Sequence, residues 1–133
     1  MANEELDKRV YVKDLKEQFD FIQISGDDNA LLNRWIIAPD VYRPGFELSG
    51  YVEPNDLKRV LVMGNKEYDF MNKLDYNTQR ERFESITDAY TPCIILSEGF
   101  KSMDSLLEVT KRKNFPVLVS DEKTYQLIVD VVS

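Results

Sequence analysis

The sequence predicts an α/β domain with a layered, mainly parallel sheet and flanking helices. Its length of 133 residues suits one hydrophobic core, and 43% of the residues are hydrophobic. The stretch 59–63 is continuously apolar, which is typical of a strand that is buried on both faces. The last third alternates strand, helix, strand and helix, an order that favours parallel pairing. No Gly/Ser-rich or Pro-rich linker divides the chain, so we expect one domain over residues 1–133.

The first elements are a short helix and a strand. Val12, Leu15 and Phe19 are spaced like one face of a helix. The stretch 21–25 predicts a strand, and the residues Gly-Asp-Asp-Asn at 26–29 predict the turn that closes it.

A second short strand is predicted at 35–38, where Pro39 limits its extension. A loop-and-helix region follows through 43–51. Asn55 or Asp56 could cap the next element, because both side chains accept hydrogen bonds from backbone N–H groups.

Two helices are predicted after the strand at 59–63, over 68–74 and 78–86. Thr78 followed three residues later by Glu81 resembles a capping box, which would place the start of the second helix at Thr78.

The last third predicts a strand at 93–96 and a helix that begins at Ser102 or Asp104. A strand at 115–120 and a final helix follow. The apolar positions of the two helices are Leu106, Leu107 and Val109, and Leu127, Ile128, Val131 and Val132.

Charge argues against a nucleic acid partner, and hydropathy argues against a membrane-spanning segment. The net charge is −7 and the isoelectric point is near 4.6. The one dense basic run, 111–113, is better placed to cap a helix end than to track phosphates. The polar start of the chain is no signal peptide, and no apolar stretch approaches the ~20 residues of a membrane helix. We therefore expect a cytoplasmic protein.

The chain lacks the residues of several common catalytic and metal sites. It has no histidine and a single cysteine, Cys93, which lies in an apolar run and is expected to be structural. Gly45 and Gly50 have the spacing of a phosphate-binding loop, but Tyr51 and Val52 stand where such a loop has Lys and Ser or Thr. No metal site is predicted. A catalytic pair among the 24 acidic residues stays a third alternative that sequence cannot test.

The segment 40–51 differs from generic core because it combines a rigid Pro-Gly turn with an arginine, a glutamate and two tyrosines. Arg43 could present its guanidinium to a small anion or to a carboxylate of a partner. Alternatively, the segment is a tight turn in which Arg43 pairs internally with Glu47. The sequence favours neither interpretation over the other.

The stretch 43–51, RPGFELSGY, resembles a motif in the amino-terminal domain of bacterial HPr kinase/phosphorylase. The resemblance continues over residues 12–132 in order and spacing. Its further matches are Arg59-Val60, Met63-Gly64, Glu67, Phe70, Pro92, Ile94-Ile95, Gly99, Leu106-Leu107-Glu108, Pro116-Val117-Leu118 and Lys123-Thr124. Glu98 departs from the family, which usually has Arg there, and this reversal counts against anion binding by that turn.

The resemblance implies a role in an oligomeric, bifunctional enzyme of carbon catabolite repression. That enzyme uses ATP and Mg²⁺ to phosphorylate a serine of HPr, the phosphocarrier of the sugar phosphotransferase system, and removes the phosphate by phosphorolysis. The chemistry belongs to a carboxy-terminal P-loop domain that this chain lacks, so no catalytic residue carries over. The resemblance also implies a fold similar to the first domain of the Mur ligases.

We therefore expect a non-catalytic regulatory or assembly domain that contacts its own kinase domain, neighbouring subunits or a small anionic ligand. The alternative is a stand-alone ligand-binding or adaptor domain of the same fold. The candidate ligand or interface residues are Arg43, Pro44, Gly45, Glu47, Gly50, Tyr51, Arg59, Gly64 and Glu67.

Overall fold

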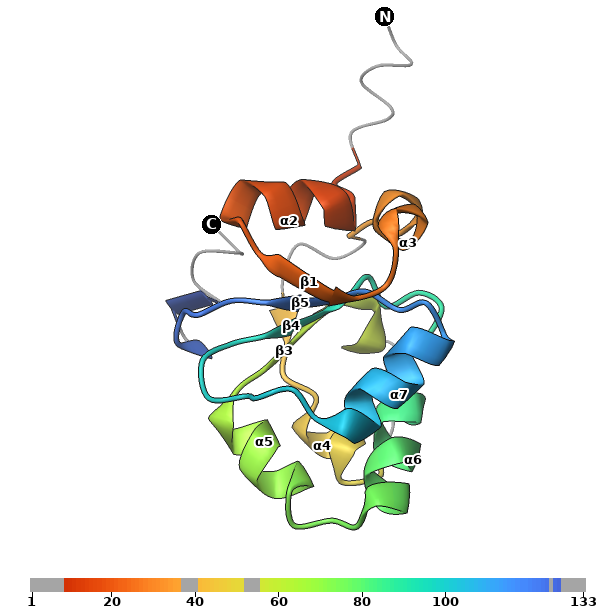
Figure 1. The fold of residues 1–133 in the computed structure, drawn as a ribbon, viewed down its shortest axis with the longest axis vertical. Helices are drawn as coiled ribbons and strands as arrows, with labels where there is room; N and C mark the ends of the chain where they lie inside the picture. Colours follow the sequence, from red (N-terminus) through yellow and green to blue (C-terminus); the bar gives the residue numbers. More distant parts are fainter. Residues whose placement is uncertain (1–8, 37–40, 52–55, 125, 128–133) are drawn as a thin grey trace, which may run out of the picture.

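A five-stranded sheet forms the centre of the computed structural model, which describes residues 9–36, 41–51, 56–124 and 126–127 (Figure 1). The strand order is β1-β5-β4-β3-β2, and the four strands β2 to β5 run parallel. The edge strand β1 pairs antiparallel with β5. The strands are β1 (Ile22–Ser25), β2 (Val41–Tyr42), β3 (Val60–Met63), β4 (Ile94–Leu96) and β5 (Val117–Val119). The predicted α/β class with a mainly parallel sheet is confirmed.

Helices cover both faces of the sheet (Figure 1). Helices α2 (Val12–Phe19) and α3 (Asp28–Asn33) lie on one face. The other face carries α4 (Gly45–Leu48), α5 (Asn65–Met71), α6 (Tyr76–Ile86) and α7 (Asp104–Arg112). A single 3₁₀ turn, Asp56–Lys58, leads into β3. Within the described residues, no helix is long and apolar enough to cross a bilayer.

The alternation of side chains along the buried strands divides the core into two layers. Leu61, Met63, Ile94 and Leu96 face α4 to α7 and pack there with Leu48, Phe83 and Leu106. Their neighbours in sequence, Val60, Val62, Cys93 and Ile95, face the other layer with Val12, Leu15 and Leu31. Both faces of the central strands are therefore apolar, which is why these strands read as continuous hydrophobic runs.

Helix starts account for three differences from the sequence prediction. The turn predicted at 26–29 is instead the start of α3, because the Asp27 carboxylate accepts a hydrogen bond from the Ala30 N–H at 3.0 Å. Helix α6 begins at Tyr76 rather than Thr78, since Asp75 caps it by accepting from the Thr78 N–H at 2.8 Å. Helix α5 begins at Asn65, three residues before the predicted start.

The strand predicted at 35–38 is wrong for the part that the structure describes. Trp35 forms only an isolated antiparallel bridge with Tyr11, and its ring meets the Tyr11 ring edge-on at 6.3 Å. Trp35 therefore tethers the start of α2 and does not join the sheet, whose next strand is β2. Residues 37 and 38 lie outside the described residues. Ile128, Val131 and Val132 of the predicted final helix also lie outside the described residues. In the described part of that segment, Thr124, Gln126 and Leu127 are helical.

Candidate functional site

A crevice lies at the edge of the sheet where the parallel strands end. The turns after β2, β3, β4 and β5 meet there, because parallel strands have their carboxyl ends at the same edge. The crevice has a volume of about 470 Å³. Its lining residues are Arg43, Asn65, Lys66, Glu98, Gly99, Lys123 and Thr124. Its walls thus come from four separate turns of the chain.

Tight packing around Gly64 fixes the base of this crevice. The Ser97 hydroxyl donates to the Met63 carbonyl at 3.1 Å and lies 2.5 Å from the Thr124 hydroxyl. A Cβ atom on Gly64 would lie only 2.0 Å from Thr124 Oγ1. The segment after β5 therefore reaches across the end of β4 to touch the end of β3, and glycine is the residue that leaves room for it.

Arg43 is held at the crevice wall by Glu67. Its Nε donates to Glu67 Oε2 at 3.1 Å and its Nη2 donates to Glu67 Oε1 at 2.8 Å, a two-pronged ion pair. Glu67 Oε1 also accepts the Gly64 N–H at 2.6 Å, while the Glu67 side chain is 8% exposed. Burial makes this carboxylate depend on its partners, so Arg43 is largely committed to it.

The predicted internal pairing of Arg43 with Glu47 is wrong. Glu47 is fully buried and accepts the Tyr42 hydroxyl on Oε2 at 3.2 Å. Its Oε1 has no hydrogen-bond partner among the residues that the structure describes. Glu47 was considered as the partner because it lies only four positions after Arg43 in the sequence. The helix α4 turns Glu47 into the protein instead, and the carboxylate that Arg43 meets comes from α5.

The other predicted site residues do not line the crevice. Pro44 is buried, and Gly45 is the first residue of α4. Gly50 has a φ of +108° and faces the guanidinium of Arg82, and Tyr51 is 65% exposed. Arg59 precedes β3 and so lies at the opposite end of that strand. The structure thus brings together Arg43, Gly64 and Glu67 out of the nine candidates.

Sequence reasoning missed most of the lining residues. Asn65 and Lys66 follow β3, Glu98 and Gly99 follow β4, and Lys123 and Thr124 follow β5. Their common signal is that each pair comes shortly after a strand of the parallel set. Among the described residues, the ammonium groups of Lys66 and Lys123 have no hydrogen-bond or ion-pair partner. These two lysines are therefore the free cations of the crevice.

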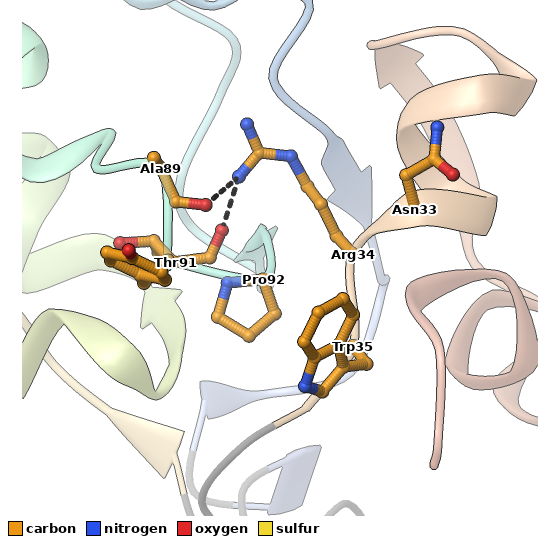
Figure 2. A pocket seen from close by; sticks show the side chains of 7 residues that line it. Asn33, Arg34, Trp35, Ala89, Thr91 and Pro92 are labelled. Atoms are coloured by element: carbon orange, nitrogen blue, oxygen red, sulfur yellow. Dashed lines mark hydrogen bonds between the residues drawn. The ribbon is translucent and has the colours of Figure 1, made fainter. Parts of the chain in front are cut away.

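A much smaller pocket of about 50 Å³ lies beside Arg34, near the amino end of β4 (Figure 2). Arg34 donates to the carbonyl oxygen of Thr91 at 2.6 Å and to that of Ala89 at 3.5 Å. Its guanidinium also stacks 4.7 Å from the centre of the Phe115 ring. Burial lowers the pKa of Arg34. This arginine serves the structure by joining the end of α3 to the loop before β4.

Cys93 lies in the second core layer and is fully buried. Burial raises the pKa of its thiol to about 12, so the thiol stays protonated near neutral pH. The prediction of a structural cysteine is confirmed.

The described residues do not fit ATP with Mg²⁺. Gly45–Leu48, which has part of the phosphate-loop spacing, is a helical turn with a buried glutamate and no lysine. Within the part of the chain that the structure describes, the residues that line the crevice include one carboxylate, Glu98, and no aromatic side chain that could stack on a base. Among the described residues, no three potential metal ligands of the His, Cys, Asp or Glu type gather.

Comparison with known proteins shows the family. Residues 10–133 match the family model described as HPr Serine kinase N terminus. The chain belongs to this family. It is similar to the HPr kinase/phosphorylases of Bacillus subtilis (strain 168), at 34% identity over 119 residues, and of Bacillus velezensis, at 35%. The relative from Bacillus pumilus is 34% identical. Each match covers 90% of this chain but 38% of the relative, so the chain spans little more than a third of their length.

Proposed function

We propose that this chain is a non-catalytic regulatory or assembly domain of a bifunctional HPr serine kinase/phosphorylase. The match of residues 10–133 to the amino-terminal family supports this proposal above all. A second support is chemical, since the described residues offer no nucleophile with an adjacent base and no phosphate-binding loop.

In this proposal, phosphorylation of HPr with ATP and Mg²⁺ takes place on a catalytic domain outside residues 1–133. The present domain contacts that kinase domain and neighbouring subunits in the cytoplasm, and it helps to control carbon catabolite repression. Its strand-end crevice is the place for a small anionic ligand. A structural similarity to the first domain of the Mur ligases stays a prediction of the same proposal.

The first test measures catalysis by the chain alone. Residues 1–133 are incubated with HPr, ATP and Mg²⁺, and we expect no phosphoserine on HPr by mass spectrometry. A full-length HPr kinase/phosphorylase is the positive control. Phosphorylation by the chain alone would overturn the non-catalytic assignment.

The second test measures regulation in a protein that carries this domain ahead of a kinase domain. Removal of the domain is expected to leave phosphorylation of HPr measurable but to change its subunit association or its response to metabolites. Unchanged association and unchanged response would contradict a regulatory or assembly role.

The second candidate is a stand-alone ligand-binding or adaptor domain, and the crevice with its two free lysines favours it. The coding sequence beyond Ser133 separates the two candidates. A phosphate-loop motif within a few dozen codons supports the kinase domain arrangement, and a stop codon supports the stand-alone domain.

A further inference from the structure

We propose that the crevice at the strand ends binds the phosphoryl group of a small ligand, with Lys66 and Lys123 as the cationic contacts. This inference rests on the proposed function for its regulatory meaning, because it names the chemistry of the ligand that such a domain would sense. Binding itself is a property of this chain and is measured without any kinase.

Local charge is the first argument. The net charge of the chain is −7, yet among the described lining residues Lys66 and Lys123 face only Glu98, while Glu67 balances the charge of Arg43. A second hollow, next to the end of β5, is lined by three acids, Asp20, Asp121 and Glu122, and by no lysine or arginine. An anion that approaches this edge of the sheet is therefore favoured in the crevice and disfavoured in the neighbouring hollow.

The availability of the cations is the second argument. Several arginines are held within the fold by described partners, such as Arg34 by carbonyl groups and Arg112 by Glu84. Lys66 and Lys123 have no such partner among the described residues, and they come from two different turns. An anion bound in the crevice can therefore be reached by two ammonium groups that do not have to leave another partner first.

The geometry of the donors favours a phosphoryl group over a carboxylate. A planar carboxylate is best recognised by the paired N–H groups of an arginine, but Glu67 already occupies Nε and Nη2 of Arg43. Lysine ammonium groups are rotatable point donors and suit a tetrahedral oxyanion approached from several sides. The Gly99 N–H, which has no acceptor among the described residues, adds a neutral donor in the same crevice.

The size and rigidity of the crevice support a small ligand. Its volume of about 470 Å³ lies within the range of small-molecule sites, about 300–1,000 Å³. The contacts among Gly64, Ser97 and Thr124 and the Arg43–Glu67 pair fix its base and one wall. A preformed site loses little conformational freedom on binding, which favours affinity even for a small ligand.

The test is a titration of the ¹⁵N-labelled chain with inorganic phosphate, followed by amide chemical shifts at constant ionic strength set with chloride. We expect saturable shifts confined to residues 64–66, 98–99 and 123–124. Malonate, a dianion with two planar carboxylate groups, is the comparison and should bind at least about fivefold more weakly. Equal responses to phosphate, malonate and added chloride, or shifts spread over the whole surface, would overturn the site.

Four variants sharpen the titration. Lys66→Gln and Lys123→Gln should each weaken phosphate binding about five- to tenfold. Glu98→Gln should strengthen it about two- to fivefold, because it removes the one opposing charge. Lys111→Gln is the matched control, since Lys111 lies in the last turn of α7 and does not line the crevice. An equal loss in Lys111→Gln would show that net charge, and not the crevice, attracts phosphate.

The two proposals fail in different ways. If the chain binds no phosphate while removal of the domain changes the behaviour of a joined kinase, the crevice inference is wrong and the regulatory role stands. If the chain binds phosphate but Lys66→Gln leaves every regulatory response of the joined kinase unchanged, the site stands and its regulatory meaning is lost.

Discussion

The two ends of the parallel strands use their cations in opposite ways. Near the amino end of β4, Arg34 donates to the carbonyl groups of Thr91 and Ala89 and covers the Phe115 ring, and the pocket beside it measures only about 50 Å³ (Figure 2). At the carboxyl ends, Lys66 and Lys123 face a crevice of about 470 Å³ without a partner among the described residues.

This difference separates structural cations from cations that a ligand can use. A buried guanidinium that satisfies carbonyl groups stabilises the fold, and removing it leaves those groups without a donor. An unpaired ammonium group contributes little to folding. Its loss should therefore leave the free energy of unfolding nearly unchanged but weaken the binding of an anion. Stability measurements on single variants can therefore test the comparison directly.

The largest effect is expected at the base of the crevice, from Gly64→Ala. The new Cβ would lie 2.0 Å from Thr124 Oγ1 and 2.9 Å from Ser97 Oγ, so the segment after β5 must shift. We expect a loss of about 2–3 kcal/mol in the free energy of unfolding, measured by urea denaturation. The second change Thr124→Ala should restore part of this loss, because it removes the closest atom. A loss that Thr124→Ala leaves unchanged would contradict the steric explanation.

At the opposite edge, Arg34→Met keeps the aliphatic length but removes the donors. We expect it to lower the free energy of unfolding by about 2 kcal/mol, because the Thr91 carbonyl loses a charge-assisted hydrogen bond. Lys66→Gln is the matched change at the crevice and should shift the same quantity by less than about 0.5 kcal/mol. Equal losses in the two variants would break the comparison.

Glu67→Gln should give an intermediate effect. It removes the charge that Arg43 meets but keeps an oxygen for the Gly64 N–H, so we expect a loss of about 1 kcal/mol. The change also releases the paired N–H groups of Arg43. Malonate should then bind more tightly relative to phosphate in the amide titration, and an unchanged preference would argue that Arg43 plays no part in selecting the anion.

The smallest effect concerns a surface ion pair and depends on pH. The hydrogen bond from Arg112 lowers the pKa of Glu84, and its ammonium neighbour Lys113 acts in the same direction. A lowered carboxyl pKa adds stability above the unfolded value of 4.5, and this stability disappears as the pH falls through the folded value. Glu84→Gln should therefore cost about 0.5 kcal/mol at pH 7 and nothing near pH 2, by denaturation at the two pH values.

The central strands β3 and β4 could be predicted from sequence because their residues are apolar on both faces, whereas the short parallel strand β2, which is only half-buried, was missed. The runs around Leu61 and Ile95 needed no knowledge of their neighbours, and each was found within about a residue of its bounds. Helix α3 was missed because Asp27 caps a helix in the same place where Gly26 suggests a turn. The residue types that cap helices are also the residue types that favour turns. Which of the two forms depends on how the following residues pack in the folded protein.

The site was predicted less completely than the fold, for a geometric reason. Arg43 was found, but its partner Glu67 lies on another element, 24 residues away, and the internal partner that the sequence suggested was the nearby Glu47. Lys66 and Lys123 are distant in sequence and have no distinctive motif, so only the strand order shows that they share a crevice. Periodicity predicts which elements form, whereas the contacts between their ends depend on the order of strands in the sheet.

The place of β1 in the sheet has a consequence for how the domain forms during synthesis. Among the described strands β1 pairs only with β5, and the Asn114 side-chain amide donates to the Asp27 carboxylate across 87 positions of sequence. When the ribosome has released the amino-terminal third, β1 therefore still lacks the strand with which it pairs, and its backbone hydrogen bonds must wait until residues 117–119 have emerged. Such late, non-local pairing slows folding and prolongs the time for which a strand edge is unpaired. An unpaired strand edge can pair with another chain, so association between unfinished chains is the hazard that this topology carries.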